Sequence, residues 1–320
     1  MRAVLLREFG PPANLVAEDV ADPIAESGQV LIRVAAASVV FIDTQLRAGH
    51  SPNPAYQPAL PVILGNGVGG TVVEVGAGVD AGIVGSRVVS TTGGSGGYAE
   101  LVAVAATDPV PIPDSMSTID AVALLADGRT AIGLTRAARP ANGEWVLVEA
   151  AGGGVGSLLV QLAAAAGARV IAAASNAEKL ALARSLGAES TVDYSVPGWV
   201  EEARSTTKAV DLVFESVGGD IGRSAFELVR DGGRFCTMGA ASGALYMPPA
   251  EEIAARNIQQ ITLRSIDPAT LRELIVAALD AAAAGDLRPT IGQTVPLEQA
   301  ADAHANIENR RSIGKTLLVP

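Results

Sequence analysis

Four closely spaced glycines carry the clearest chemical signal in this sequence. Gly152, Gly153, Gly154 and Gly156 follow a short apolar run, in the spacing Ala150-x-x-Gly153-x-x-Gly156. Because glycine has no Cβ, such a turn lets the backbone come close to a pyrophosphate. The first N–H groups of a following helix would point at that anion, and the helix dipole would favour its charge. The pattern therefore indicates dinucleotide binding.

The residues on either side of the turn predict the elements that position it. Residues 146–148 are typical of a buried strand, residues 157–166 of a helix, and residues 169–173 of a second buried strand. A strand, a glycine turn, a helix and a strand are the context that a dinucleotide fingerprint requires. Ala151 stands where a strict G-x-G-x-x-G motif has its first glycine, and glycine runs also make plain loops. The strand and helix context favours the dinucleotide site.

Strand and helix patterns continue to alternate from residue 178 to residue 238, which predicts an open parallel sheet covered by helices. Ligands of such sheets lie beyond the carboxyl ends of the strands. The residues that follow two of the later strands are therefore lining candidates: Ser216, Val217, Met238, Gly239 and Ala240.

The first part of the chain has a different pattern. Residues 1 to about 120 contain short strand candidates separated by glycine and proline, which predicts a compact, barrel-like β domain. Within it, Asp43 could cap a short helix over residues 44–48 or take part in chemistry. Residues 113–139 predict an interrupted helical stretch, with a second helix opening at Arg129.

The residues after the second strand of the fingerprint unit bear on which dinucleotide binds. An NAD site usually has an acid there for the ribose 2′-hydroxyl, but residues 173–176 read Ala-Ala-Ser-Asn. Ser175 could donate a hydrogen bond to a 2′-phosphate, Lys179 could supply a positive charge, and Tyr194 a hydroxyl. Lys179 alone fits a solvated helix position equally well. With the acid absent, we expect NADPH rather than NADH.

Composition limits the other classes of function. The 320 residues are 49% hydrophobic and 18% charged, which excludes global disorder and allows two domains. The net charge of −11 disfavours nucleic acid and anionic membranes as partners. Cys236 is the single cysteine and should be a buried, inert thiol; with only His50 and His304 in addition, a zinc site of the usual composition cannot form. The N-terminal residues have no signal-peptide pattern, so we expect a cytoplasmic protein.

Four motifs together resemble the zinc-independent quinone oxidoreductases of the medium-chain dehydrogenase/reductase superfamily. They are residues 38–49, residues 61–70, the Ala150–Gly156 turn and residues 308–315. The resemblance extends over nearly the whole chain. It implies a GroES-like β-barrel substrate domain over residues 1–122, a doubly wound Rossmann domain that binds NADP(H) over residues 123–264, and a segment over residues 265–320 that completes the substrate domain.

The resemblance also implies a set of site residues. Phe41, Gln45 and Thr130 would face the nicotinamide and a small-molecule acceptor. Thr130 could bond the carboxamide or the acceptor, or it could cap a helix N-terminus. No residue stands out as a general acid, so the proton could come from water. With the fingerprint, the cofactor set is Gly153, Gly154, Val155, Gly156, Ser175, Lys179, Tyr194, Ser216, Val217, Gly239, Ala240, Arg264 and Lys315.

The chemistry that the resemblance implies has no metal. Zinc-dependent relatives carry ligands at the positions of Val40, Asn66 and Ala126, and none of these side chains binds zinc well. Without a Lewis acid, alcohol oxidation is disfavoured, and hydride transfer to a quinone or an α,β-unsaturated carbonyl is favoured because the acceptor delocalises the charge. Val40 and Gln45 replace the Asn and Tyr of many such reductases, which leaves the substrate class open.

Two alternatives remain beside an NADPH-dependent reductase of quinones or enones. A 2-enoyl-thioester reductase needs positive charge for a carrier phosphate, and Arg47 and Arg129 are the obvious cations. A non-catalytic NADPH-binding sensor needs no acceptor at all. The family habit and the apolar run at residues 258–265 further imply a homodimer joined through the nucleotide-binding sheets. RNA binding, which the resemblance also raises, fits poorly with the net charge.

Overall fold

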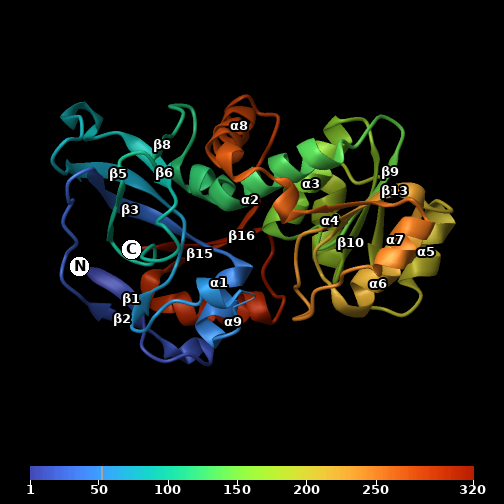
Figure 1. Ribbon diagram of the computed structural model, residues 1–320, viewed down its shortest axis with the longest axis horizontal. Coiled ribbons are helices and arrows are strands. Elements are labelled where there is room, and N and C mark those ends of the chain that lie inside the picture. Colours follow the sequence, from blue (N-terminus) through green and yellow to red (C-terminus); the bar gives the residue numbers. More distant parts are fainter. Residues whose placement is uncertain (52) are drawn as a thin grey trace. The chain divides into compact units, whose positions relative to one another are not determined.

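The computed structural model describes residues 1–51 and 53–320 and divides into two compact units (Figure 1). Unit 1 comprises residues 1–126 and 278–320, and unit 2 comprises residues 127–277. The chain enters unit 2 within helix α2 (Thr118–Ala138) and leaves it within helix α8 (Leu271–Ala283). Among the described residues, no helix has both the length and the hydropathy that crossing a bilayer requires.

Unit 2 is built on a six-stranded parallel sheet. Its strands are β9 (Trp145–Val148), β10 (Arg169–Ala174), β11 (Ser190–Asp193), β12 (Val210–Glu215), β13 (Val229–Thr237) and β14 (Gln259–Thr262). The spatial order is β11-β10-β9-β12-β13-β14, so the winding direction reverses between β9 and β12. This reversal is the switch point at which ligands of doubly wound sheets bind, and the expected fold class is confirmed for this unit.

Helices cover both faces of this sheet. They are α3 (Gly154–Ala165), α4 (Ala177–Ser185), α5 (Trp199–Thr206), α6 (Gly219–Leu228) and the short α7 (Ala250–Ala255). Figure 1 shows α3 and α4 side by side on one face, and α5 and α6 on the other. The strands are apolar and buried because they are covered on both sides.

Aromatic residues fill the core on the side of α6. The ring of Phe226 meets that of Phe235 edge-on, with centroids 5.2 Å apart. Leu147 and Ile171 belong to the same buried cluster. Cys236, the next residue of β13, is fully buried, and burial raises the pKa of its thiol to about 12. The thiol is therefore inert, as the sequence predicts.

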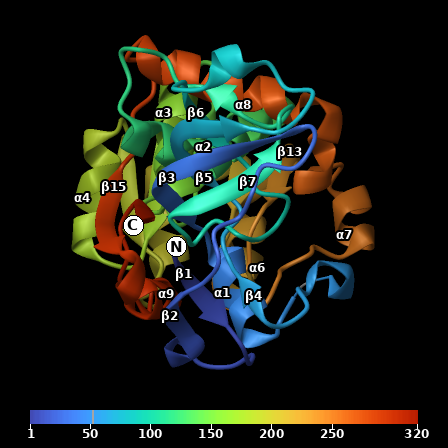
Figure 2. The ribbon, with the colours of Figure 1, turned by 90° about the vertical axis from the view of Figure 1, so that its left-hand side faces the viewer.

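Unit 1 contains two antiparallel-rich sheets. The smaller has the order β2-β1-β4, formed by β1 (Arg2–Leu6), β2 (Leu15–Asp19) and β4 (Val62–Ile63). The larger has the order β15-β16-β3-β5-β6-β8, with β7 also paired to β3. Its strands are β3 (Gln29–Val39), β5 (Val68–Val75), β6 (Arg87–Ser90), β7 (Leu101–Ala105), β8 (Val110–Pro111), β15 (Ile291–Pro296) and β16 (Lys315–Val319). Figure 2 faces this unit and shows β3 beside β5 and β7. Because β16 pairs with β3, the C-terminal segment belongs to the same sheet as the N-terminal strands.

The helical stretch before the Rossmann unit differs from the prediction. Helix α2 is continuous, so the expectation of a second helix that opens at Arg129 is wrong. A Cβ at Gly133 would lie 2.7 Å from Ile266 Cδ1 and 3.1 Å from Leu274 Cδ1. Glycine at this position therefore serves close packing instead of ending the helix. The same packing explains why residues 265–277 belong to unit 2 although the resemblance implied a boundary at residue 265.

Other differences are local. Strand β14 covers only part of the run at residues 258–265, because residues 263–265 form a 3₁₀ turn. Strand β15, whose alternating half-buried and exposed residues include polar ones, and the short helix α7 were not predicted from the sequence.

A buried polar cluster fixes the start of helix α1 (Phe41–Ala48) in unit 1. Asp43 Oδ2 accepts hydrogen bonds from the Val40 N–H at 3.0 Å and from the Tyr98 hydroxyl at 2.9 Å. The same hydroxyl lies 3.1 Å from Nε2 of His304 in helix α9 (Ala300–Glu308). Burial raises the pKa of Asp43 to about 6 and lowers the pKa of His304 to about 3. The predicted role of Asp43 as the N-cap of a helix over residues 44–48 is therefore wrong. Helix α1 begins three residues earlier, at Phe41, with Val40 as its N-cap residue, and Asp43 supports this start from the third position of the first turn.

We predict that His304 makes unit 1 sensitive to acid. Its folded-state pKa is lower than the unfolded value of 6.5, so its contribution to stability is present above pH 6.5 and is lost as the pH falls towards 3. The raised pKa of Asp43 acts in the opposite direction between about pH 4 and 6. The free energy of unfolding is measured in urea by circular dichroism at pH 7 and pH 5. Its decrease between these pH values should be about 2 kcal/mol smaller in His304→Gln than in the wild type. The matched control, His50→Gln on the surface, should leave the pH dependence unchanged; an unchanged slope in His304→Gln would contradict the assignment.

Candidate functional site

The glycine turn lies at the switch point, between the end of β9 and the start of α3. Gly153 is the N-cap of α3, with φ −87° and ψ 175°. Its N–H donates to the Ala150 carbonyl at 2.8 Å, and its carbonyl accepts from the Ser157 N–H at 2.9 Å. The first N–H groups of α3 have no acceptor within the helix. The predicted strand, turn, helix and strand are all present, with the helix beginning three residues earlier than predicted, at Gly154.

The glycines of the turn have two different roles. A Cβ at Gly154 would overlap the Asp127 carboxylate, and a Cβ at Gly156 would overlap the Ala150 carbonyl. These two glycines are therefore required by packing within the protein. At Gly153 an added Cβ would meet only the Ala150 oxygen, at 3.2 Å. The turn thus leaves room at Gly153, beside the free N–H groups, where a phosphate of a dinucleotide would fit.

Ala150 is held in an uncommon conformation at the first position of this motif. Its φ is +45°, in the left-handed region that costs an alanine about 1 kcal/mol. The sequence spacing identified the position but gave no sign of the strain. Strain of this kind persists only where the surrounding structure holds it, and it is often found at ligand-binding turns.

Lys179 packs against the same turn from α4. The Asn176 side chain caps this helix by accepting from the Lys179 N–H at 2.9 Å. A Cβ at Gly152 would lie 2.5 Å from Lys179 Cβ, so the absence of a side chain there admits the lysine stem. Lys179 is only 8% exposed. The alternative of a solvated helix lysine is therefore wrong.

The other residues expected near the adenosine end follow β10 and β11. Ser175 comes directly after β10, and its carbonyl accepts from the Ser195 hydroxyl at 3.4 Å. Tyr194 donates its N–H to the Ala174 carbonyl at 3.1 Å, and its ring belongs to the buried cluster beside Trp199. The two loops are therefore adjacent, although the Tyr194 side chain is largely buried.

The loops after β12 and β13 are also joined. The Ser216 carbonyl accepts from the Ala241 N–H at 3.2 Å, and a Cβ at Gly239 would lie 2.6 Å from the same oxygen. Ser216, Val217, Gly239 and Ala240 therefore meet at the carboxyl edge of the sheet, as predicted. The Val217 side chain is fully buried, so this residue can present only backbone to a ligand.

Two buried carboxyl groups link the loops after β9 and β12, and the sequence analysis missed them. Glu149 Oε2 accepts from the N–H groups of Ser216 at 3.2 Å and Val217 at 3.1 Å, and Glu215 Oε1 accepts from the Gly218 N–H. Both carboxyls are fully buried, and each affects the pKa of the other. Burial raises the pKa of Glu149 well above its usual range, and repulsion by Glu215 adds to it; burial raises the pKa of Glu215 to about 7. The pair therefore keeps at least one proton at neutral pH.

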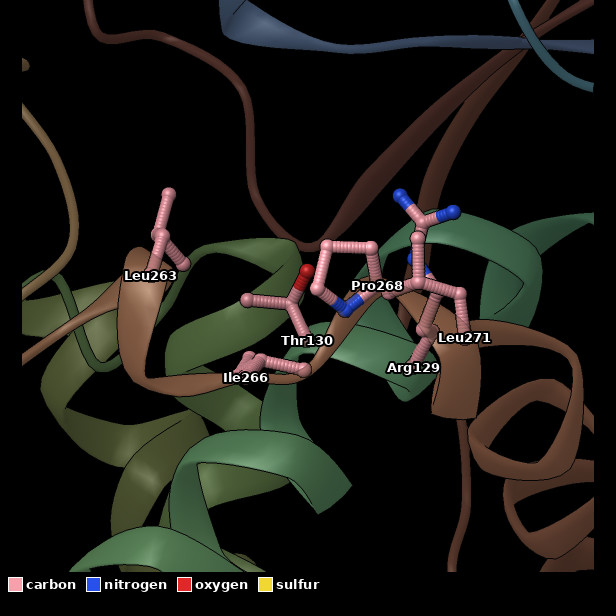
Figure 3. A pocket seen from close by; sticks show the side chains of 6 residues that line it. All are labelled: Arg129, Thr130, Leu263, Ile266, Pro268 and Leu271. Atoms are coloured by element: carbon pink, nitrogen blue, oxygen red, sulfur yellow. The ribbon is translucent and has the colours of Figure 1, made fainter.

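A cavity of about 220 Å³ in unit 2 lies between α2 and the segment that follows β14 (Figure 3). Its lining residues are Arg129, Thr130, Leu263, Ile266, Pro268 and Leu271. Thr130 is an interior residue of α2, so its alternative role as a helix N-cap is wrong. Burial lowers the pKa of the Arg129 guanidinium, and the charge of Asp127 acts in the opposite direction.

The remaining predicted residues are distributed over both units. Phe41 and Gln45 lie half-buried on α1, and Lys315 is buried at the start of β16, all in unit 1. Arg264 is exposed in the 3₁₀ turn after β14, in unit 2. Val155 lies in the first turn of α3.

The positions at which zinc-dependent relatives hold their ligands have other roles. Asn66 Oδ1 accepts from the N–H groups of Thr92 at 3.1 Å and Gly94 at 2.7 Å, so this amide organises a loop. Val40 is the N-cap residue of α1, and Ala126 lies within α2. In the described part of the chain, no three His, Cys, Asp or Glu side chains are grouped so that they could hold a metal ion.

Comparisons with known proteins agree with this architecture. The family model of the alcohol dehydrogenase GroES-like domain matches residues 26–114, and that of the zinc-binding dehydrogenases matches residues 154–280. A 2-haloacrylate reductase from Burkholderia sp is 33% identical over 99% of this chain and 98% of its own length. A quinone oxidoreductase from Rattus norvegicus is 32% identical over 100% of this chain and 98% of its own.

Two solved structures with NADPH are similar over their full length and over all of this chain. The quinone oxidoreductase of Escherichia coli complexed with NADPH has a TM-score of 0.90 at 27% identity. The mycobacterial protein Rv1454c complexed with NADPH also has a TM-score of 0.90, at 31% identity.

We predict that the proton kept by the carboxyl pair makes unit 2 sensitive to alkali. Both folded-state pKa values are raised, so the stability that the pair contributes is present below pH 4.5 and is lost as the pH rises through about 7. The free energy of unfolding of the wild type should fall by more than about 1 kcal/mol between pH 6 and pH 8. The fall should be smaller in Glu149→Gln, because one ionisation is removed. Trp145 and Trp199 lie in this unit and report its unfolding in urea. An equal loss in Glu149→Gln would contradict the prediction, and exposed Glu189→Gln is the matched control.

Proposed function

Because this chain belongs to the quinone oxidoreductase family of the medium-chain dehydrogenase/reductase superfamily, we propose that it reduces a quinone or an α,β-unsaturated carbonyl with NADPH and without zinc. The observation that carries the proposal is the turn at Gly153. It leaves room for a phosphate beside free N–H groups and has a buried lysine packed against it. The names of the relatives, which cover both quinone and 2-haloacrylate reduction, support an electron-poor acceptor.

Three features support NADP(H) as the cofactor. Two structural neighbours are complexes with NADPH. The end of β10 carries no acid that would repel a 2′-phosphate. Lys179 lies against the turn, where a cation could pair with that phosphate.

The proposed reaction needs little from the protein beyond positioning. NADPH, when bound, supplies a hydride. The acceptor takes up the hydride and a proton, and its conjugated system delocalises the charge that develops between these events. The turn at Gly153 would hold the pyrophosphate, and Thr130 would orient the reacting end. Val40, Asn66 and Ala126 offer no strong zinc ligand, so these positions would contribute no metal to the reaction.

The alternative of a 2-enoyl-thioester reductase loses part of its support. It relied on Arg47 and Arg129 as cations for a carrier phosphate. Arg47 is 2% exposed and forms an ion pair with Glu308, so its charge is already matched within unit 1. Arg129 remains.

We further propose that the protein is a homodimer. Strand β14 is an edge of the parallel sheet and could pair with its counterpart in a second copy. Sedimentation velocity should then give twice the monomer mass, and a monomer at micromolar concentration would contradict this proposal.

Steady-state oxidation of NADPH with matched acceptors tests the proposed activity. We expect turnover with quinones or 2-enones and none with saturated ketones, because only a conjugated acceptor delocalises the charge without a metal. Tight NADPH binding without turnover for any quinone, enone or enoyl thioester would favour the sensor instead. Turnover confined to enoyl thioesters would favour the thioester reductase.

The cofactor preference should depend on Lys179. In calorimetric titrations, Lys179→Ala should raise the Kd for NADPH about tenfold or more and change the Kd for NADH less than about threefold, because only NADPH carries the 2′-phosphate. The exposed Lys208→Ala is the control and should change neither value. Equal weakening of both cofactors would assign Lys179 a packing role only.

A further inference from the structure

The cavity in unit 2 has one charged lining residue. Four of its six lining residues are apolar, Thr130 adds a hydroxyl, and Arg129 adds a guanidinium (Figure 3). Figure 3 shows the Arg129 and Thr130 side chains extending from α2 toward the segment that carries Pro268. The volume of about 220 Å³ is below the roughly 300–1,000 Å³ of sites for drug-sized ligands, so this cavity suits a small group.

One carboxylate, that of Asp127, acts on the charge of Arg129. The carboxylate of Asp127 attracts it, but that carboxylate lies against the glycine turn, where a Cβ on Gly154 would overlap it, and is not part of the cavity lining. Burial disfavours the charged guanidinium, which nevertheless stays protonated because its intrinsic pKa is so high. A partly desolvated cation beside apolar side chains favours an anion as its ligand.

We propose that Arg129 makes the acceptor of this enzyme a small α,β-unsaturated carboxylate, with the carboxylate bound by the guanidinium. The inference rests on the proposed function and specifies its substrate class. Thr130 supports this orientation, because it follows Arg129 directly in α2 and is the residue expected at the nicotinamide end. The pyrophosphate cradle is at the start of α3, and none of its residues lines this cavity. We therefore assign the cation to the acceptor and not to a phosphate of the cofactor.

The chemistry explains why a cation belongs there. The β-carbon of the acceptor gains the hydride from NADPH, which becomes NADP⁺, and the π electrons of the C=C bond move to the α-carbon and the carboxylate. The carboxylate then carries a second negative charge until the α-carbon takes a proton from water. An arginine that forms two hydrogen bonds to these oxygens stabilises that charge more than the single charge of the ground state. Arg129 should therefore affect kcat as well as KM.

A matched pair of acceptors tests the proposal. 2-Chloroacrylate and its methyl ester have the same C=C bond, but only the acid is an anion. For the wild type, kcat/KM should be higher for the acid. Arg129→Met should lower kcat/KM for the acid about 10- to 100-fold and change the value for the ester less than about threefold. Arg129→Lys keeps the charge but loses the planar guanidinium. Its kcat/KM for the acid should lie between the values of the wild type and Arg129→Met.

Two controls accompany these variants. Arg136→Met removes an exposed arginine of the same helix, which pairs with Glu273. This variant should leave kcat/KM unchanged for both the acid and the ester. The Kd for NADPH, measured by titration, should be the same in wild type and in Arg129→Met, which also shows that the variant is folded.

Three results would overturn the proposal. An equal decrease of kcat/KM for the acid and the ester in Arg129→Met would assign Arg129 a general packing role. A raised Kd for NADPH with no selective loss for the acid would assign the cation to a cofactor phosphate. Reduction of neutral quinones with no activity on 2-chloroacrylate would refute the carboxylate class while leaving the proposed reductase function in place. Failure of the proposed reductase function gives a different result. In that case the wild type would not oxidise NADPH with any acceptor, whether neutral or anionic.

Discussion

Close approach of backbone to backbone at the end of β9 is the constraint on which the rest of unit 2 depends. Gly154 and Gly156 have no room for a Cβ, because a carboxylate and a carbonyl occupy the space. With glycine at both positions, α3 can begin directly after the turn and direct its first N–H groups to one place. Ala150 accepts a strained φ so that the chain can reverse there. The turn is thus fixed by internal packing, and Gly153 alone is left open for a ligand.

The carboxyl pair extends this constraint to the neighbouring loop. Glu149 ends the run that leads into the glycine turn, and Glu215 ends β12. Glu149 accepts from the N–H groups of Ser216 and Val217 and so joins the two loops on either side of the switch point, while Glu215 accepts from the Gly218 N–H within its own loop. Two carboxylates this deeply buried could not both be ionised, so at least one proton is part of the structure. A cofactor bound across the switch point would therefore meet two loops that are already positioned against each other.

Sequence reasoning succeeded where the information is local. The strand, turn, helix and strand of the fingerprint unit follow from periodicity and glycine spacing within about 30 residues, and all four are present. The start of α1 was predicted three residues too late, because Asp43 acts from the third position of the first turn and Val40 is the N-cap residue. What the sequence could not reveal depends on contacts between distant positions. Tyr98 and His304, which complete the Asp43 cluster, are separated from their partners by 55 and 206 positions.

The missed features of unit 2 have the same origin. The Glu149 and Glu215 carboxyls meet only because β9 and β12 are neighbours in the sheet. The continuity of α2 was missed because Gly133, a weak helix former, is explained by close packing against Ile266 and Leu274, which lie more than a hundred residues further on. Gly152 had no assigned role until the stem of Lys179 was found against it. Both glycines are visible in the sequence, but the reason for each is known only once the side chain that packs against it is identified.

The net charge of the chain limits how anionic ligands can bind. A chain with a net charge of −11 repels a polyanionic cofactor and an anionic acceptor at long range. Binding of either must therefore come from short-range groups in partly desolvated positions, where electrostatic interactions are less screened. Unit 2 places such groups apart: helix N–H groups at the glycine turn with Lys179 packed beside it, and Arg129 in the cavity. Such an arrangement would bind the anion of the cofactor and that of the acceptor through different groups, so that the selectivity for each could be changed independently.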